Sequence, residues 1–123
     1  MKWNYVALAA LASAFLGWTL LSQPAAKHAS PRVIEVTAKR FAFEPAEITV
    51  EQGEPVVLVL RSLDVTHGLR FHELNLDVKV SKGATIQVPF TPAVPGDFVG
   101  HCSVFCGSGH GQMTLTIHVV RKL

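Results

Sequence analysis

Beyond residue 32, apolar side chains recur at every second position, which is the period of a β-strand. Residues 34–38 and 113–119 alternate most regularly, with their apolar side chains predicted to face the interior. Glycine and proline turns separate further strand candidates at 47–50, 56–60, 77–80, 86–90 and 97–100. The run at 56–60 is apolar throughout, so we expect both of its faces to be covered. No helical stripe follows residue 21, and the pattern predicts an all-β sandwich or barrel.

A different pattern precedes this domain. Residues 3–21 are almost uncharged and, as a helix, would span about 28 Å, close to one hydrocarbon core. Either a cleaved signal sequence or a retained membrane anchor fits, and the poor cleavage signal that follows favours the anchor. Because only Lys2 precedes the run, we expect the remainder on the outer side of the membrane. The expected organisation is an anchor or signal segment at 1–22, a tether at 23–32 and one domain at 33–123.

Composition limits the possible functions. The chain has 123 residues, 49% of them apolar and 16% charged, which suits one folded domain with an appendage better than a disordered chain or a coiled coil. Its formal net charge is +2, and acidic and basic residues are interspersed in the domain. This distribution provides no cationic face for a nucleic acid.

The residues with the most distinctive chemistry lie between the last two strand candidates. The segment at 102–113 reads Cys-Ser-Val-Phe-Cys-Gly-Ser-Gly-His-Gly-Gln-Met. Its cysteine, histidine and methionine side chains offer thiolate, imidazole and thioether ligands, which copper prefers. The segment has no carboxylate, which argues against calcium or magnesium. A second histidine, His67, follows the strand predicted at 56–60 and could complete the site from the end of that strand.

Each of these residues also has a simpler explanation. Cys102 and Cys106 belong to an exported domain, where two nearby cysteines often form a structural disulfide. Met113 occupies an inward-facing strand position and could be a core residue, and His67 alone could be a turn residue. A zinc site is a further alternative, although zinc seldom takes a methionine ligand. The combination is more specific than any one of its members.

The combination resembles the binuclear copper A site of cytochrome c oxidase subunit II, whose signature is C-S-x-x-C-G-x-x-H-x-x-M. The named positions of that signature match Cys102, Ser103, Cys106, Gly107, His110 and Met113. Residues 64–68 are similar to the D-V-x-H-G segment of the same family, which contains its first histidine ligand. The resemblance extends over residues 34–120, and the single apolar N-terminal segment is similar to that of short, one-helix bacterial subunits.

The resemblance implies a cupredoxin-like Greek-key β-sandwich that binds two copper ions. Both cysteines would bridge the two metals, each histidine would bind one of them, and a methionine and a backbone carbonyl would be weak axial ligands. The implied ligands are His67, Cys102, the carbonyl of Val104, Cys106, His110 and Met113. Many family members have glutamate at the position of Val104, and in some oxidases its side chain serves a magnesium site. We therefore expect no such magnesium ligand here.

The resemblance also implies a function: the electron-accepting subunit of a membrane terminal oxidase. Electrons would come from an exported cytochrome c or a small copper protein and leave to a haem-copper subunit I, so the chain would not itself reduce oxygen. Longer family members have a tryptophan-rich stretch near the cytochrome c docking surface, but both tryptophans here precede the domain. Phe41 or Phe43 could take that place, although both are also core candidates. A stand-alone copper A shuttle or copper-handling protein, and a disulfide-closed β-sandwich binding module, are the alternatives.

Overall fold

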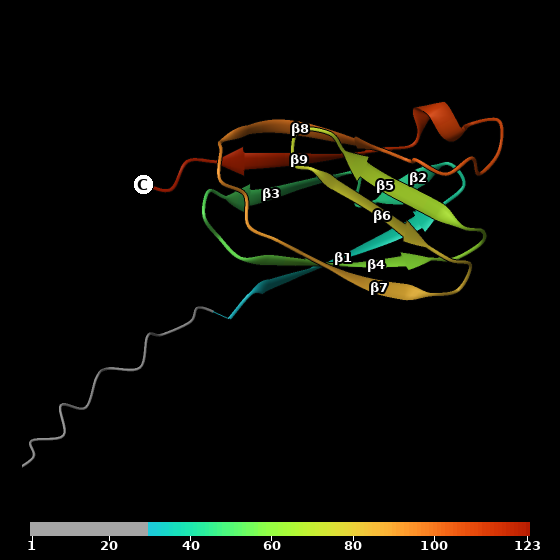
Figure 1. The fold of residues 1–123 in the computed structure, drawn as a ribbon, viewed down its shortest axis with the longest axis horizontal. Helices are drawn as coiled ribbons and strands as arrows, with labels where there is room; N and C mark the ends of the chain where they lie inside the picture. The colour runs from blue at the N-terminus through green and yellow to red at the C-terminus, as the bar shows by residue number, and fades with distance from the viewer. Residues whose placement is uncertain (1–29) are drawn as a thin grey trace, which may run out of the picture.

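The computed structural model describes residues 30–123, which form two β-sheets packed face to face (Figure 1). One sheet has the strand order β2-β1-β4-β7 and the other β3-β9-β8-β5-β6. The strands are β1 (Arg32–Lys39), β2 (Ala42–Glu44), β3 (Glu47–Glu51), β4 (Val56–Ser62), β5 (His67–Phe71), β6 (Leu76–Val80), β7 (Thr85–Phe90), β8 (Gly96–His101) and β9 (Thr114–Val120). The apolar run at 3–21 lies outside the described residues. Within residues 30–123, no helix is long and apolar enough to cross a membrane.

The chain crosses repeatedly between the two sheets. β1 pairs in parallel with β4, and β3 pairs in parallel with β9, while the remaining pairs are antiparallel. β4 and β7 pair with each other, although the β5–β6 hairpin between them in sequence belongs to the opposite sheet. This connectivity is the Greek-key arrangement expected from the sequence.

The core lies between the sheets and consists of the inward side of each alternating strand. The side chains that contribute most to it are almost fully buried: Val36, Leu58 and Leu60 from one sheet, and Leu69, Phe71, Leu115 and Ile117 from the other. Each such side chain stabilises the fold by about 1.5–3 kcal/mol relative to its exposed state. The core therefore holds the loops at the end of the sandwich on a rigid support.

The structure confirms each strand that the sequence predicted and corrects three details. The run at 56–60 is not covered on both faces: its even-numbered residues are buried, but Val57 and Val59 are only half-buried, because no further layer within residues 30–123 covers that side of the sheet. Two strands, β2 and β5, were not predicted. His67 does not end the preceding strand but begins β5, in the opposite sheet.

Candidate metal centre

The predicted site residues converge at one end of the sandwich, on the right of the view in Figure 1. His67 is the first residue of β5, and the two cysteines follow β8. His110 begins the short 3-10 turn η1 (His110–Gln112), and Met113 connects this turn to β9. Two segments, the start of β5 and the continuous stretch at 102–113, therefore supply the predicted ligands.

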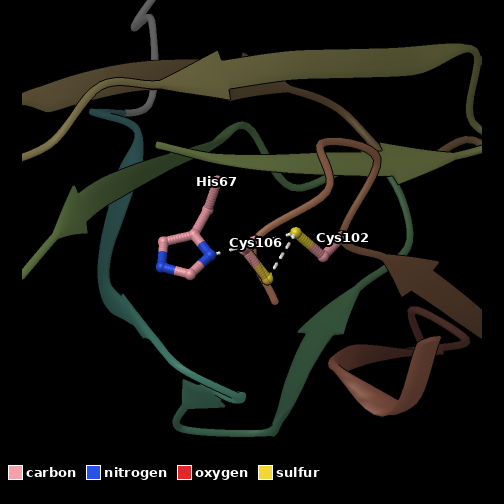
Figure 2. A group of neighbouring side chains, drawn as sticks. All are labelled: His67, Cys102 and Cys106. Atoms are coloured by element: carbon pink, nitrogen blue, oxygen red, sulfur yellow. Dashed lines mark hydrogen bonds between the residues drawn. The ribbon is translucent and has the colours of Figure 1, made fainter. Parts of the chain in front are cut away.

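Two thiols and one imidazole form the buried part of this site. Figure 2 shows His67, Cys102 and Cys106 pointing toward one another, and their ligand atoms all lie within 4.8 Å of one another. The Cys102 Sγ atom is 3.8 Å from Cys106 Sγ and 3.9 Å from His67 Nδ1. Cys102 and Cys106 are each 4% exposed, and His67 is fully buried. Buried imidazole and thiol groups facing one another are suited to holding a metal ion.

The remaining predicted ligands lie around the same two sulfur atoms. The Cys106 Sγ atom is 4.0 Å from His110 Nδ1 and 3.9 Å from Met113 Sδ. The Cys102 thiol donates a hydrogen bond to the Val104 carbonyl at 3.1 Å. Each sulfur thus has one imidazole nitrogen and one weaker donor atom beside it. The structure brings all six predicted donors together.

The two cysteines are free thiols, so the disulfide considered above is not formed. Their sulfur atoms are 3.8 Å apart, whereas a disulfide bond is about 2.05 Å long. Burial raises the pKa of the Cys106 thiol to about 11, and its hydrogen bond with Cys102 contributes to the increase. Without a metal, Cys106 is therefore protonated at neutral pH, and a metal ion has to displace its proton.

Asp64 orients the buried histidine, a role that the sequence pattern did not reveal. His67 Nε2 lies 2.7 Å from Asp64 Oδ1. Burial alone would raise the pKa of Asp64, but hydrogen bonds from the Arg40 amide, the His67 ring and the Val65 amide outweigh it and lower the pKa to about 2. Because an ionised carboxylate only accepts hydrogen bonds, Nε2 carries the ring proton. Nδ1, which faces Cys102, is left with a free lone pair for a metal.

The loop that carries the cysteines is packed closely against neighbouring segments. The Ser103 hydroxyl donates to Asp77 Oδ1 at 3.3 Å, on the neighbouring strand β6. The ring of Phe41 lies on the backbone of Gly107 and Gly109, where a Cβ would come within 2.8 and 2.4 Å of the ring. Of the two phenylalanines considered above, Phe43 is a core residue and Phe41 lies over the loop.

The donor set fits copper. It combines two thiols, two imidazoles, a thioether and a backbone carbonyl, and soft sulfur ligands together with imidazole are those that copper prefers. Zinc also binds cysteine and histidine, but its sites rarely include a thioether. The β-sandwich and the buried cysteine–histidine cluster thus define a class of small copper-binding domains.

Comparison with known proteins agrees with this class. Residues 10–115 match the family model described as the cupredoxin-like domain, and the chain belongs to this family. Over 86 residues it is 36% identical to cytochrome c oxidase subunit 2 of Thermus thermophilus, a match that covers 70% of this chain and 64% of that protein. The chain thus spans less than two thirds of this relative. The resemblance to cytochrome c oxidase subunit II is confirmed.

Two solved structures have a similar fold. The periplasmic domain of subunit II of cytochrome oxidase (CoxB) of Bradyrhizobium japonicum aligns with a TM-score of 0.67 and 20% identity, covering 73% of this chain and 84% of that one. A chain of a heme-copper terminal oxidase dimer aligns with a TM-score of 0.66 and 28% identity, covering 72% and 65%. The first similarity concerns the fold alone.

Proposed function

We propose that this chain is the electron-accepting subunit of a membrane terminal oxidase, with a binuclear copper A centre in the domain at 33–123. The electron donor would be an exported cytochrome c or a small copper protein, and the acceptor a haem-copper subunit I. The segment at 1–22 would anchor or export the chain, and the tether at 23–32 would hold the domain on the outer side of the cell membrane. The similarities to subunit 2 of Thermus thermophilus and to a heme-copper terminal oxidase support this assignment.

One observation carries the proposal: the donors are divided evenly between two adjacent thiols. His67 and the Val104 carbonyl lie beside Cys102, whereas His110 and Met113 lie beside Cys106. If two copper ions shared both thiolates, each ion would also have one imidazole and one weak ligand beside it. A mononuclear site would leave part of this donor set unused.

A bound copper pair would supply a redox centre that accepts and passes on one electron. The chain's own residues limit how far the ligands move when the charge of the centre changes. Asp64 holds the His67 ring, the core supports β5 and β9, and Phe41 and Ser103 restrain the loop. Burial of the thiols and of Met113 keeps bulk water from the sulfur ligands. Restricted ligand movement and exclusion of water both favour rapid electron transfer over substrate chemistry.

Electron paramagnetic resonance of the copper-loaded full chain, with copper counted on the same sample, tests the proposed centre. We expect two copper ions per chain and hyperfine structure from one electron shared between two nuclei. The variants Cys102→Ser and Cys106→Ser should each lose this signal, and Ser108→Ala, in the exposed part of the loop, should retain it. A single-copper signal in the wild type, or an unchanged spectrum in either cysteine variant, would contradict the proposal.

Purification from native membranes tests the assignment to an oxidase. We expect the chain to co-purify with a multi-helix subunit that contains haem. Isolation as a lone chain with an intact copper pair would contradict the oxidase assignment and support the stand-alone electron shuttle instead.

A further inference from the structure

The turn between β1 and β2 contacts both halves of the metal centre through one residue. The backbone amide of Arg40 donates to Asp64 Oδ2 at 2.7 Å, and Asp64 in turn holds the His67 ring. The Arg40 side chain reaches in the other direction, and its Nε donates to the Cys106 carbonyl at 2.8 Å. Arg40 therefore connects the segment of one buried ligand to the segment of another.

We infer that Arg40 is a positioning residue, whose guanidinium holds the backbone of Cys106 at a fixed place relative to His67. This inference rests on the proposed copper centre. Arg40 and Cys106 are 66 positions apart in the sequence. The intervening chain is too long to fix the distance between them, so the contact itself has to do so. Within the strands, the hydrogen bonds between neighbouring strands fix the distances between distant residues. Cys106 lies in the loop after β8, outside the strands, so these hydrogen bonds do not hold it.

The loop benefits from such a restraint because three glycines follow Cys106, and glycine limits the backbone less than any other residue. Gly107, with φ of 139°, is in a conformation that other residues rarely adopt, and Gly109 and Gly111 follow within four residues. The neighbouring Phe41 covers Gly107 and Gly109, but among the described residues its ring makes only apolar contacts with the loop. Arg40 is exposed, but its hydrogen bond has an ionised donor, and the residue that accepts it, Cys106, is 4% exposed. Loss of this bond should therefore change the equilibrium between the ordered and the displaced loop about tenfold.

Three variants separate the hydrogen bond from the charge. Arg40→Met keeps an unbranched side chain that reaches as far as the position of Nε, but it removes the donor and the charge. Arg40→Gln has an amide nitrogen the same number of bonds from Cα as Nε, so it restores a donor without the charge. Arg61→Met is the matched control, because Arg61 is an exposed arginine on β4 that contacts none of the predicted ligands in the part of the chain that the structure describes. None of these changes alters the backbone amide that binds Asp64.

Two measurements on the full chain test the inference. In the copper-free protein, amide hydrogen exchange at residues 106–110 should be faster in Arg40→Met than in the wild type, with exchange in β4 and β9 unchanged. In the copper-loaded protein, Arg40→Met should release copper to a chelator about tenfold faster and show an altered hyperfine pattern. Arg40→Gln should behave much more like the wild type, and Arg61→Met should equal it.

Each contrary result has a definite meaning. If Arg40→Met equals Arg61→Met in both measurements, or if Arg40→Gln is as impaired as Arg40→Met, the positioning role is wrong. If amide exchange in Arg40→Met became faster to the same extent in the loop, in β4 and in β9, the positioning role would also be contradicted, because Arg40 would then stabilise the whole fold. If the wild type binds no copper pair, the proposed function fails, and the exchange measurement on the copper-free chain still decides the role of Arg40.

Discussion

The side chain of Ser103 lies directly against the Cα atom of Gly68. A Cβ at Gly68 would overlap Ser103 Oγ and would lie 3.0 Å from the backbone nitrogen of Val104. Gly68 adjoins His67, and Ser103 adjoins Cys102, so this contact brings two ligand segments together. Glycine is required at residue 68 for the space it leaves, since its φ is not in the left-handed region.

The variant Gly68→Ala should therefore destabilise the site and the fold together. Overpacking of this kind costs about 1–3 kcal/mol, and Ser103 would have to leave Asp77 to make room. Urea unfolding of the copper-free chain measures the loss of stability. The control is Gly111→Ala, in the same loop, where a Cβ would meet no atom within 4 Å. Equal stability of the two variants would contradict the packing argument.

The variant Asp64→Asn should weaken copper binding about 10- to 100-fold, as changes to residues that orient metal ligands commonly do. The asparagine side chain has one acceptor oxygen, so it cannot serve the His67 ring and the amides of Arg40 and Val65 as the carboxylate does. Competition with a chelator measures the affinity. Asp97→Asn, on β8 next to His118, is the matched control and should bind copper like the wild type. Unchanged affinity in Asp64→Asn would contradict the orienting role.

The variant Met113→Leu should keep the fold and both metals but shift the reduction potential. Met113 is fully buried with its Sδ 3.9 Å from Cys106 Sγ, and a weak thioether ligand adjusts a copper centre without building it. Leucine has a similar volume, so the loss of stability should be below about 1.5 kcal/mol. Voltammetry measures the potential, and Leu115→Met on β9 is the control. Complete loss of copper would show that the methionine is essential for binding and that our prediction is wrong.

His118 should make the stability of the domain depend on pH. A hydrogen bond that the His118 ring donates to Asp97 on β8, assisted by Glu47 on β3, raises the pKa of His118 above its ordinary value of 6.5. Because the folded-state pKa is the higher one, this stabilisation is complete below about pH 6.5 and is lost as the pH rises through the folded-state pKa. His118→Gln should therefore be less stable than the wild type at about pH 5.5, with a smaller difference at about pH 8.5. Urea unfolding at both values measures this, and an equal difference would contradict it.

The predictable part of the fold is the part in which burial follows the strand period. β9 alternates between buried and half-buried residues along its length, and the sequence pattern predicted it with nearly correct bounds. β5 was missed because four of its five residues are buried and no alternation results. Gly68 is buried by the loop that carries the cysteines, and Leu69 by the core. Both are tertiary contacts, which a local sequence pattern does not contain.

The candidate site divides in the same way. Four of the predicted donors could be recognised because they share one short segment, and His67 because it follows the strand predicted at 56–60. The family resemblance supported these five and added the Val104 carbonyl. Asp64 could not be assigned a role because its spacing from His67 does not show that its side chain turns toward the ring. Arg40 could not be assigned one, because its role depends on the β1–β2 turn lying beside the loop after β8. That turn joins two strands of one sheet and the loop follows a strand of the other, so their proximity is a tertiary relationship that no local signal specifies.

The position of β9 in its sheet also has a consequence for biogenesis. This strand is synthesised after the other eight, yet it occupies an interior place between β3 and β8. The sandwich consequently remains open until the C-terminal strand inserts, and the cysteine loop that leads into it acquires its shape in the same event. A chain truncated before β9 would therefore leave β3 and β8 without the strand that pairs with both, and the loop that carries the cysteines without its second support.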